Sequence, residues 1–347
     1  MNILVDFHHA GLLNSLILLF EKRLGCKVYR PIGREWFDEG YWKVYDHPAT
    51  VAQFLDIGGA NPDKTDPVNE VEGEKDGIFL CHDIASNETN RAITLDKFRK
   101  MNFSIVIASI PQHVTPFLKL CEKHWSMPKL IFQIGNQWQN EASNVENIMV
   151  SARIDTKNKH SVVYHQEFDT NVFCRASSDV FVPKITSLIN CFPTDGMFKE
   201  DWELFQKVET LMPKIEFKCL GGQGRDGMAH GEQGVADEIR SSGFVWQTKR
   251  GGDGYGHIVH NTGACGIPML VKKEYYEGKM GEDLMIDGVT CVCIDNLNPQ
   301  QIVDKIHYYS APLRWKSMCE NTYRNFKKNV DFDNEEKKIR HFLSELV

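Results

Sequence analysis

The sequence predicts an α/β protein of two units, each built on an open and mostly parallel sheet. Three observations predict it. Apolar strand-like runs alternate with amphipathic helical segments in two separate stretches, glycine-rich turns follow several of the strands, and 347 residues are enough for two domains of ordinary size. Strands that are separated by helices pair in parallel, so each unit is expected to be Rossmann-like.

The first unit opens with a strand, a glycine-containing loop, a helix and a second strand. Its predicted elements are a strand over 3–6, a loop over 7–11, a helix over about 12–24, a strand over 27–30, a strand over 103–109, a helix over 115–124 and a strand over 129–134. Between them lie an irregular aromatic stretch, 31–56, and a polar loop, 58–77. Their composition favours an excursion from the sheet that decorates one edge of the domain.

The second unit begins near Lys184 and repeats the same alternation. Its predicted elements are strands over 185–190, 215–222, 244–249, 268–273 and 289–295, with helices over 198–212, after the glycine-rich stretch 221–234, and from near His257. From Pro299 onward the sequence has helical period and no strand signal. We therefore predict an N-terminal acceptor-binding domain over 1–175, a C-terminal nucleotide-sugar-binding domain over 176–325, and a C-terminal helix over 326–347 that packs back toward the first domain.

The composition indicates the cellular compartment of the protein but does not decide whether it binds nucleic acid. The formal charge of -7 repels nucleic acid only mildly, so it neither demands nor excludes DNA. The ten cysteines include no CxxC pair, which is typical of reduced, buried thiols rather than of a zinc site or a disulfide framework. The opening apolar run, NILV, is interrupted at Asp6, so we expect no secretory leader, and no segment approaches the roughly 20 apolar residues of a membrane helix. We expect a cytoplasmic protein.

The stretch from Gly251 to Gly256 is the clearest candidate for a binding site. It precedes a helix that begins near His257, and its glycines allow backbone N–H groups to approach an anion closely. Lys249 and Arg250 stand just before it and would add positive charge for a diphosphate. An ordinary turn between a strand and a helix, with exposed basic residues, would have the same glycines.

The segment DGYGHIVHNTGACGIPML resembles the donor-binding signature of GT-B glycosyltransferases of the glycogen-synthase-like type, also called group 1. The residues in register with that signature are Asp253, Gly254, Tyr255, Gly256, Ala264, Cys265, Gly266 and Pro268. In that family the first acidic residue, here Asp253, lies near the donor sugar, and a second one holds the nucleotide ribose. Asn261 occupies the second position, where it can hydrogen-bond a ribose hydroxyl without the charge-assisted contact of a glutamate.

Three further segments resemble the same superfamily in the same order along the chain. They are 103–136, which resembles a strand, helix and strand of the first domain, 165–175, which resembles the linker, and 281–306, which resembles the segment after the donor loop. The resemblance implies a GT-B fold, in which two Rossmann-like domains face each other across a cleft. It also implies that the second domain binds a nucleotide sugar as co-substrate.

The remaining candidate residues lie in loops after strands. Gly11 is expected to approach the donor phosphates, and His8 or His9 is a candidate base, with His9 our choice. His113 resembles the site where retaining members hold the donor sugar, although it could equally be a surface loop histidine. Gly222 and Gly224 resemble the turn after the second strand of the donor domain. Arg225 beside them either reaches the diphosphate or pairs locally with Asp226.

The predicted activity is metal-independent transfer of a hexosyl group, with a UDP-sugar as the expected donor and no cofactor. The sole DxD, at 331–333, falls between helices instead of at a strand end, so no metal site is predicted. The acceptor remains open. A cluster of aromatic and basic residues is typical of a sugar site, of a nucleic-acid site or of a buried aromatic core: Arg30, Arg34, Trp36, Phe37, Tyr41, Trp42, Lys43 and Tyr45.

Two alternatives stay beside this prediction. One is a phage-type DNA glycosyltransferase that acts on a hydroxymethylated base, which would make modified DNA a partner. The other is a nucleotide-sugar epimerase of the same fold or a non-catalytic sugar-binding relative. The sequence leaves open the nucleotide, the sugar, the stereochemistry of transfer and the oligomeric state.

Overall fold

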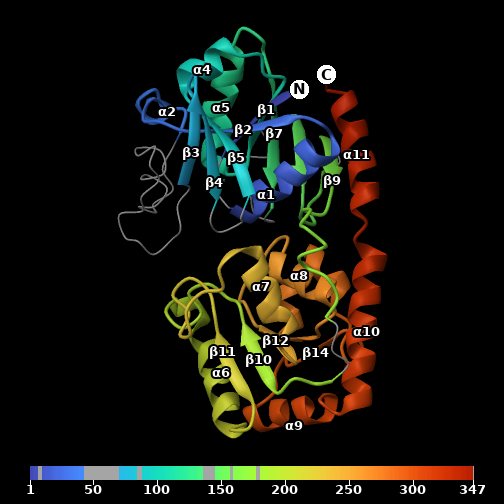
Figure 1. Ribbon diagram of the computed structural model, residues 1–347. Coiled ribbons are helices and arrows are strands. Elements are labelled where there is room, and N and C mark those ends of the chain that lie inside the picture. The colour runs from blue at the N-terminus through green and yellow to red at the C-terminus, as the bar shows by residue number, and fades with distance from the viewer. Residues whose placement is uncertain are drawn as a thin grey trace. The chain divides into compact units, whose positions relative to one another are not determined.

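The structure is a computed structural model that describes residues 1–6, 10–42, 70–83, 88–135, 145–156, 159–176 and 180–346. The chain divides into two compact units (Figure 1). Unit 1 comprises Met1–Phe168 and Phe332–Val347, and unit 2 comprises Asp169–Asp331. The predicted boundaries were 175 and 326. Phe168 packs edge-on against Phe332, with ring centroids 5.3 Å apart, which keeps both ends of this junction in unit 1.

Unit 1 is built on a nine-stranded sheet of order β3-β4-β5-β2-β1-β6-β7-β8-β9, in which only the pairs β3/β4 and β4/β5 are antiparallel. Its strands are β1 Asn2–Val5, β2 Lys27–Pro31, β3 Glu70–Lys75, β4 Ile78–Asp83, β5 Glu88–Ile93, β6 Ile105–Ala108, β7 Lys129–Ile134, β8 Asn147–Val150 and β9 His160–Val163. Its helices are α1 Ala10–Ile17, which continues as the π-helical turn η1 Leu18–Arg23, then α2 Glu35–Asp38, α4 Leu95–Lys100, α5 Pro111–Lys123 and α11 Phe332–Ser344.

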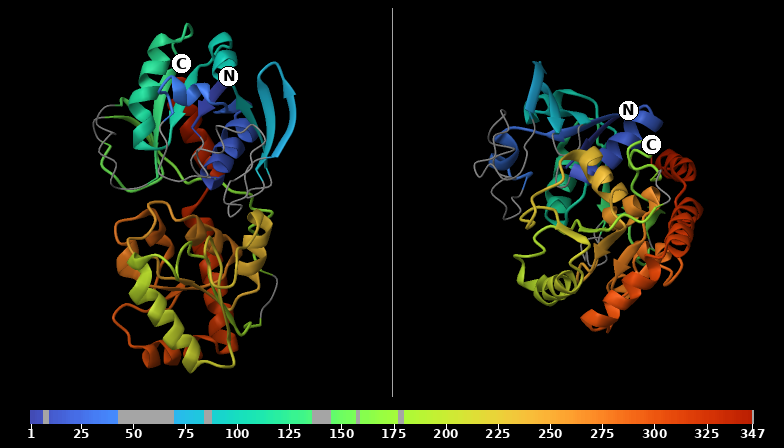
Figure 2. Two further views of the ribbon diagram at one scale, coloured as in Figure 1. Left: turned by 90° about the vertical axis from the view of Figure 1, so that its left-hand side faces the viewer. Right: turned by 60° about the horizontal axis from the view of Figure 1, so that its bottom comes forward.

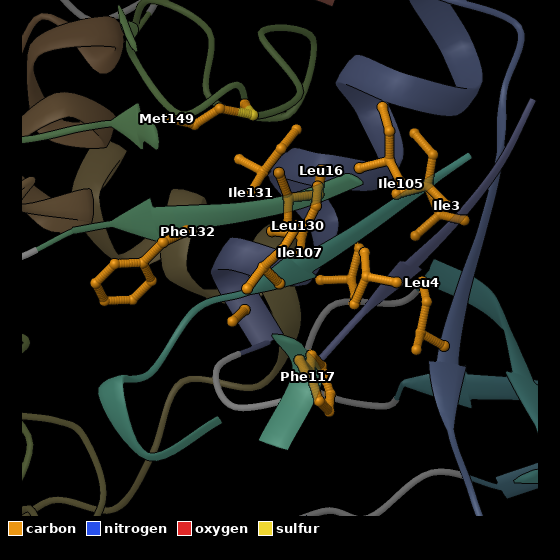
Figure 3. Packing of buried hydrophobic residues seen from close by; sticks show 14 of the residues in the cluster. Ile3, Leu4, Leu16, Ile105, Ile107, Phe117, Leu130, Ile131, Phe132 and Met149 are labelled. Carbon is orange, nitrogen blue, oxygen red and sulfur yellow. The ribbon is translucent and has the colours of Figure 1, made fainter. Parts of the chain in front are cut away.

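The central strands of unit 1 are apolar without alternation because helices cover both faces of the sheet. Ile3, Leu4 and Ile105 are fully buried, as are Ile131 and Phe132 on β7. Leu16 of α1 and Phe117 of α5 belong to the same cluster of buried side chains (Figure 3). Each such side chain stabilises the fold by about 1.5–3 kcal/mol through burial alone.

The predicted excursion between 31 and 77 is partly wrong. β3 falls inside the predicted polar loop, and β3, β4 and β5 extend the sheet at one edge (Figure 2). The sequence EVEGEK has no apolar alternation, so nothing in its hydropathy predicts a strand. The turn is the missed signal: Asp76 and Gly77 both have positive φ, 53° and 76°, which is the geometry of a two-residue hairpin.

Two helices begin earlier than predicted. α1 starts at Ala10, so Gly11 lies in its first turn instead of in a loop. α5 starts at Pro111, the position where proline is tolerated because the first N–H groups have no partner within the helix. His113 is therefore a residue of the first helical turn and is fully buried, which corrects both its predicted loop position and the surface alternative.

Unit 2 is a five-stranded parallel sheet of order β11-β10-β12-β13-β14. Its elements are β10 Lys184–Ser187, η3 Gly196–Phe198, α6 Lys199–Leu211, β11 Glu216–Cys219, α7 Gly231–Arg240, β12 Phe244–Gln247, α8 His257–Cys265, β13 Met269–Val271, η4 Lys273–Tyr276, η5 Met280–Leu284, β14 Cys291–Cys293, α9 Pro299–Tyr309 and α10 Pro312–Asn329. The strand order reverses between β10 and β12. Open parallel sheets bind ligands at such a point, beside the carboxyl ends of the strands.

Gly243 immediately precedes β12 and has no room for a side chain. A Cβ at this position would lie 2.3 Å from the Val182 carbonyl oxygen and 2.4 Å from the Phe181 ring. Gly243→Ala is therefore expected to lower the free energy of unfolding of unit 2 by about 2 kcal/mol. Urea unfolding measures it, with Gly196→Ala as the control because nothing lies within 4 Å of a Cβ there. Equal midpoints for the two variants would contradict the expectation.

The C-terminal helix α11 belongs to unit 1 and contacts β9 (Figure 1). Arg23 holds it by ion pairs to Asp333, at 2.7 Å, and to Glu336, at 3.5 Å, and Phe342 stacks on His160. Asp333 is also the last residue of the DxD, so that carboxylate serves in an ion pair. Among the described residues no helix is both long and apolar enough to cross a membrane.

Candidate functional site

The loop between β12 and α8 lies at the point where the strand order of unit 2 reverses. Gly251, Gly252 and Gly256 have positive φ angles of 76°, 57° and 80°, which let the loop turn sharply. Gly256 is the N-cap of α8 and offers no side-chain oxygen to the first N–H groups of the helix. Those groups, together with the helix dipole, suit an anion.

A lysine that the sequence did not single out holds this loop in place. Lys279 donates to the carbonyl oxygen of Gly251 and, at 2.5 Å, to that of Tyr275. A Cβ at Gly252 would lie 2.3 Å from the same Tyr275 oxygen, so the loop packs directly against η4. Burial, the largest cause, lowers the pKa of Lys279, and the positive charge of Lys249 lowers it further, whereas Asp253 acts in the opposite direction.

The two predicted cations of the loop are paired with carboxylates. Lys249 forms an ion pair with Asp253, and both side chains are about one-third exposed. Arg250 donates to Glu200, and its Nε lies 3.3 Å from Asp201 Oδ2. The hydrogen bond to Glu200, the largest cause, raises the pKa of Arg250, and the negative charge of Asp201 also raises it. The predicted side chains Lys249, Arg250 and Asp253 thus come together in one loop. The partners of Arg250, Glu200 and Asp201, were not part of the sequence prediction.

Asp201, in the first turn of α6, is the centre of this charge network. Its carboxylate is fully buried and lies 2.6 Å from Lys272 Nζ, while the Tyr275 hydroxyl donates to it at 3.2 Å. Lys272 directly follows β13, so three separate segments meet at one carboxylate. No local motif marks these residues, because the contact joins positions about seventy apart in sequence.

The aromatic and polar residues of the signature lie at the start of α8. Tyr255 is buried and stacks on His260, with ring centroids 4.0 Å apart, and His257 lies edge-on to it at 5.2 Å. Asn261 is 7% exposed, and its Oδ1 accepts no hydrogen bond within the described part of the chain. Gly254 sits between Asp253 and Tyr255 and is buried. The amide oxygen of Asn261 is therefore available at the position for which the resemblance implies a ribose contact.

The turn after β11 is built around its glycines. A Cβ at Gly224 would lie 2.7 Å from the Cys219 carbonyl oxygen and 2.9 Å from the backbone of Gly221. Gly222 donates its N–H to Asn190 Oδ1 at 2.8 Å, which ties this turn to the loop after β10.

Arg225 pairs locally, as the alternative for this residue predicted. It lies 2.6 Å from Glu209 and 3.0 Å from Asp226, and it donates to the Phe217 carbonyl at 2.8 Å. With its donors directed to these partners, the fork of Arg225 stabilises the β11 turn.

Unit 1 carries a second constellation where its own strand order reverses, between β1 and β6. Asp6, immediately after β1, lies 2.8 Å from His113 Nδ1, and both side chains are fully buried. The same carboxylate accepts the backbone N–H of Ser109 at 2.7 Å and that of Ile110 at 3.3 Å. Trp42 packs on the His113 ring with centroids 4.0 Å apart. The sequence prediction contained His113 but not the aspartate that orients it.

The two candidate bases of unit 1, His8 and His9, lie outside the described residues. The aromatic cluster is largely core, since Trp36, Tyr41 and Trp42 are buried and Arg30 is only 1% exposed. Lys43 and Tyr45 are also outside the described residues. The buried-core interpretation therefore holds for the four buried residues, whereas Phe37 is partly buried and the Arg34 side chain is 74% exposed.

Two doubly wound, mostly parallel units, with a glycine loop and a helix start at the reversal point of the second, are the architecture expected of the GT-B fold. The chain resembles solved GT-B glycosyltransferases over its whole length, which confirms the predicted fold. Anabaena HepE in complex with UDP and glucose is 11% identical, with a TM-score of 0.60 over 99% of each chain. An α-glucosyltransferase in complex with UDP and a 13-mer DNA is 8% identical, with a TM-score of 0.63 over 100% of this chain and 99% of that one.

A third example is the pneumococcal O-GlcNAc transferase GtfA in complex with UDP and GlcNAc. It is 10% identical, with a TM-score of 0.60 over 100% of this chain and 99% of that one. No protein-family model matches the sequence, and no curated protein matches it. Within the described residues, no group of three or more His, Cys, Asp or Glu side chains could hold a metal ion.

Proposed function

We propose that the chain is a glycosyltransferase that moves a hexosyl group from a UDP-sugar to an acceptor hydroxyl. The observation that carries the proposal is the β12–α8 loop. Glycines with positive φ, a helix start without a side-chain cap and two cations meet at the ligand-binding edge of the sheet. The three solved structures named above were determined in complex with UDP, which supports the choice of nucleotide.

In this proposal the leaving diphosphate is stabilised by the protein's own charges. The first N–H groups of α8 and the side chains of Lys249 and Arg250 would bind its oxygens as negative charge develops on them. Asp253 would lie near the sugar, and the Oδ1 of Asn261 would accept a hydrogen bond from a ribose hydroxyl. No metal and no cofactor take part.

Unit 1 would present the acceptor, with His113, oriented by Asp6, toward the donor sugar and His9 as the base. We also propose a cytoplasmic location, which is supported by the ten cysteines, all of them free thiols.

DNA is the second candidate acceptor. This candidate rests on the similarity to the α-glucosyltransferase that was solved with DNA. Binding to duplex DNA that weakens steeply with salt would support this candidate, and no binding at low salt would dismiss it.

A thermal-shift panel of nucleoside diphosphates and nucleotide sugars tests the donor. A ligand at about a hundred times its Kd stabilises the protein by about 2.7 kcal/mol, which raises the Tm by about 5 °C or more for a unit of this size. We expect UDP and UDP-sugars to cause this shift and GDP to cause less. Product analysis then separates transfer from epimerisation. No shift with any nucleotide would contradict the proposed function.

A further inference from the structure

Arg250 has two acidic partners that are neighbours in sequence and opposite in environment. Glu200 and Asp201 both lie in the first turn of α6. The Glu200 side chain is 76% exposed, and the Asp201 side chain is fully buried. Each takes a different nitrogen of the guanidinium: Glu200 accepts from Nη2, and Asp201 from Nε.

Asp201 is fixed whether or not Arg250 is present. Lys272 at 2.6 Å and the Tyr275 hydroxyl at 3.2 Å hold its carboxylate from the loop after β13. A buried carboxylate in such a network does not leave its partners, because an unpaired buried charge is strongly destabilising. Asp201 therefore anchors the inner side of the Arg250 guanidinium and sets the direction of its outer nitrogens.

Glu200 is held far less firmly. An ion pair between exposed side chains contributes little to the free energy of folding, since water competes for both charges. The hydrogen bond to Arg250, the largest cause, lowers the pKa of Glu200, so this carboxylate is charged and occupies the guanidinium at neutral pH. A diphosphate carries more charge than a carboxylate and matches the planar fork of arginine with two oxygens.

We propose that Glu200 is an intramolecular stand-in for the donor diphosphate, which replaces it on Arg250 while Asp201 keeps its hold on Nε. The inference rests on the proposed function and adds two residues to it. Asp201 is a positioning residue, and Glu200 is a competitor that the ligand must displace. The exchange moves no proton and breaks no covalent bond.

The two acidic residues should therefore act in opposite directions. Glu200→Gln removes the competing charge, so UDP and inorganic pyrophosphate should bind about two- to fivefold more tightly, the range that an exposed ion pair allows. Asp201→Asn leaves Lys272 and Arg250 without their buried partner and should weaken binding by about tenfold or more.

Titration calorimetry of the full chain with UDP and with pyrophosphate tests this inference. Glu203→Gln is the matched control: it makes the same charge change on the same helix, where Glu203 pairs with Lys207 instead. We expect Glu200→Gln to bind UDP and pyrophosphate more tightly than wild type, and Glu203→Gln to bind them as wild type does. Binding by Glu200→Gln that is equal to or weaker than wild type, or an equal gain in Glu203→Gln, would overturn the inference.

If Asp201→Asn does not fold, the Glu200→Gln variant still decides the question, because the Glu200 side chain is on the surface and its replacement should leave the fold intact. The failure of the proposed function is also distinguishable. A wild-type protein that binds neither UDP nor pyrophosphate would reject the donor site, and the stand-in role with it. A wild type that binds both, with an unchanged Glu200→Gln, rejects the stand-in role only.

Discussion

Replacing Lys249 and Arg250 together by alanine is expected to lower the rate of sugar transfer at least a hundredfold (about 10²) while the protein remains folded. Both side chains would face the diphosphate as its charge develops, and removing one such donor commonly costs 10²–10³ in rate, on the order of 3–4 kcal/mol. The fold should survive because both side chains are about one-third exposed and Asp201 keeps Lys272 and Tyr275 as partners.

The measurement is the release of UDP from a UDP-sugar, with thermal unfolding as the check on folding. Arg324→Ala is the control, because Arg324 is an exposed cation of the same unit that pairs with Glu320 far from the loop in sequence. Its activity should stay within about twofold of wild type. Full activity in the double variant would reject the assignment of these two cations to the diphosphate.

The parallel core of both units could be predicted because its signal is local. Runs such as Ile3 to Val5 are apolar on every residue, and only strands covered on both faces tolerate that pattern. The edge of the unit 1 sheet could not be predicted in the same way. From Glu72 to Lys75 every residue of β3 is exposed, so the strand needs no apolar face and its hydropathy gives no strand pattern. Only the Asp76–Gly77 turn indicates it.

The candidate site shows the same division between local and distant signals. The glycines of the β12–α8 loop can be recognised in the sequence because glycine is the residue that adopts positive φ angles most easily. The partners of Arg250 and Arg225 depend on which helix the fold brings beside them. Asp201 and Glu209 lie on α6, separated from those arginines by other elements, and nothing in their neighbourhood in sequence marks them.

Asp6→Ala is expected to destabilise unit 1 by about 3 kcal/mol. The substitution removes a buried carboxylate that accepts from His113 and from the backbone N–H groups of Ser109 and Ile110. Each of these donors would then be buried without its acceptor, and each unsatisfied buried donor costs about 1–3 kcal/mol. Hydrogen exchange of the β1 and β6 amides measures the loss within unit 1, where protection should fall by about a hundredfold.

Asp96→Ala is the control for that loss, because Asp96 forms an exposed i,i+4 pair with Lys100 and should change protection by less than about twofold. Asp6→Asn separates stability from activity. It retains an oxygen for the backbone N–H groups but loses the charge that orients His113, so it should recover most of the protection and still transfer sugar slowly. If Asp6→Asn transfers at the wild-type rate, the buried pair serves the fold alone, and His113 has no part in holding the donor sugar.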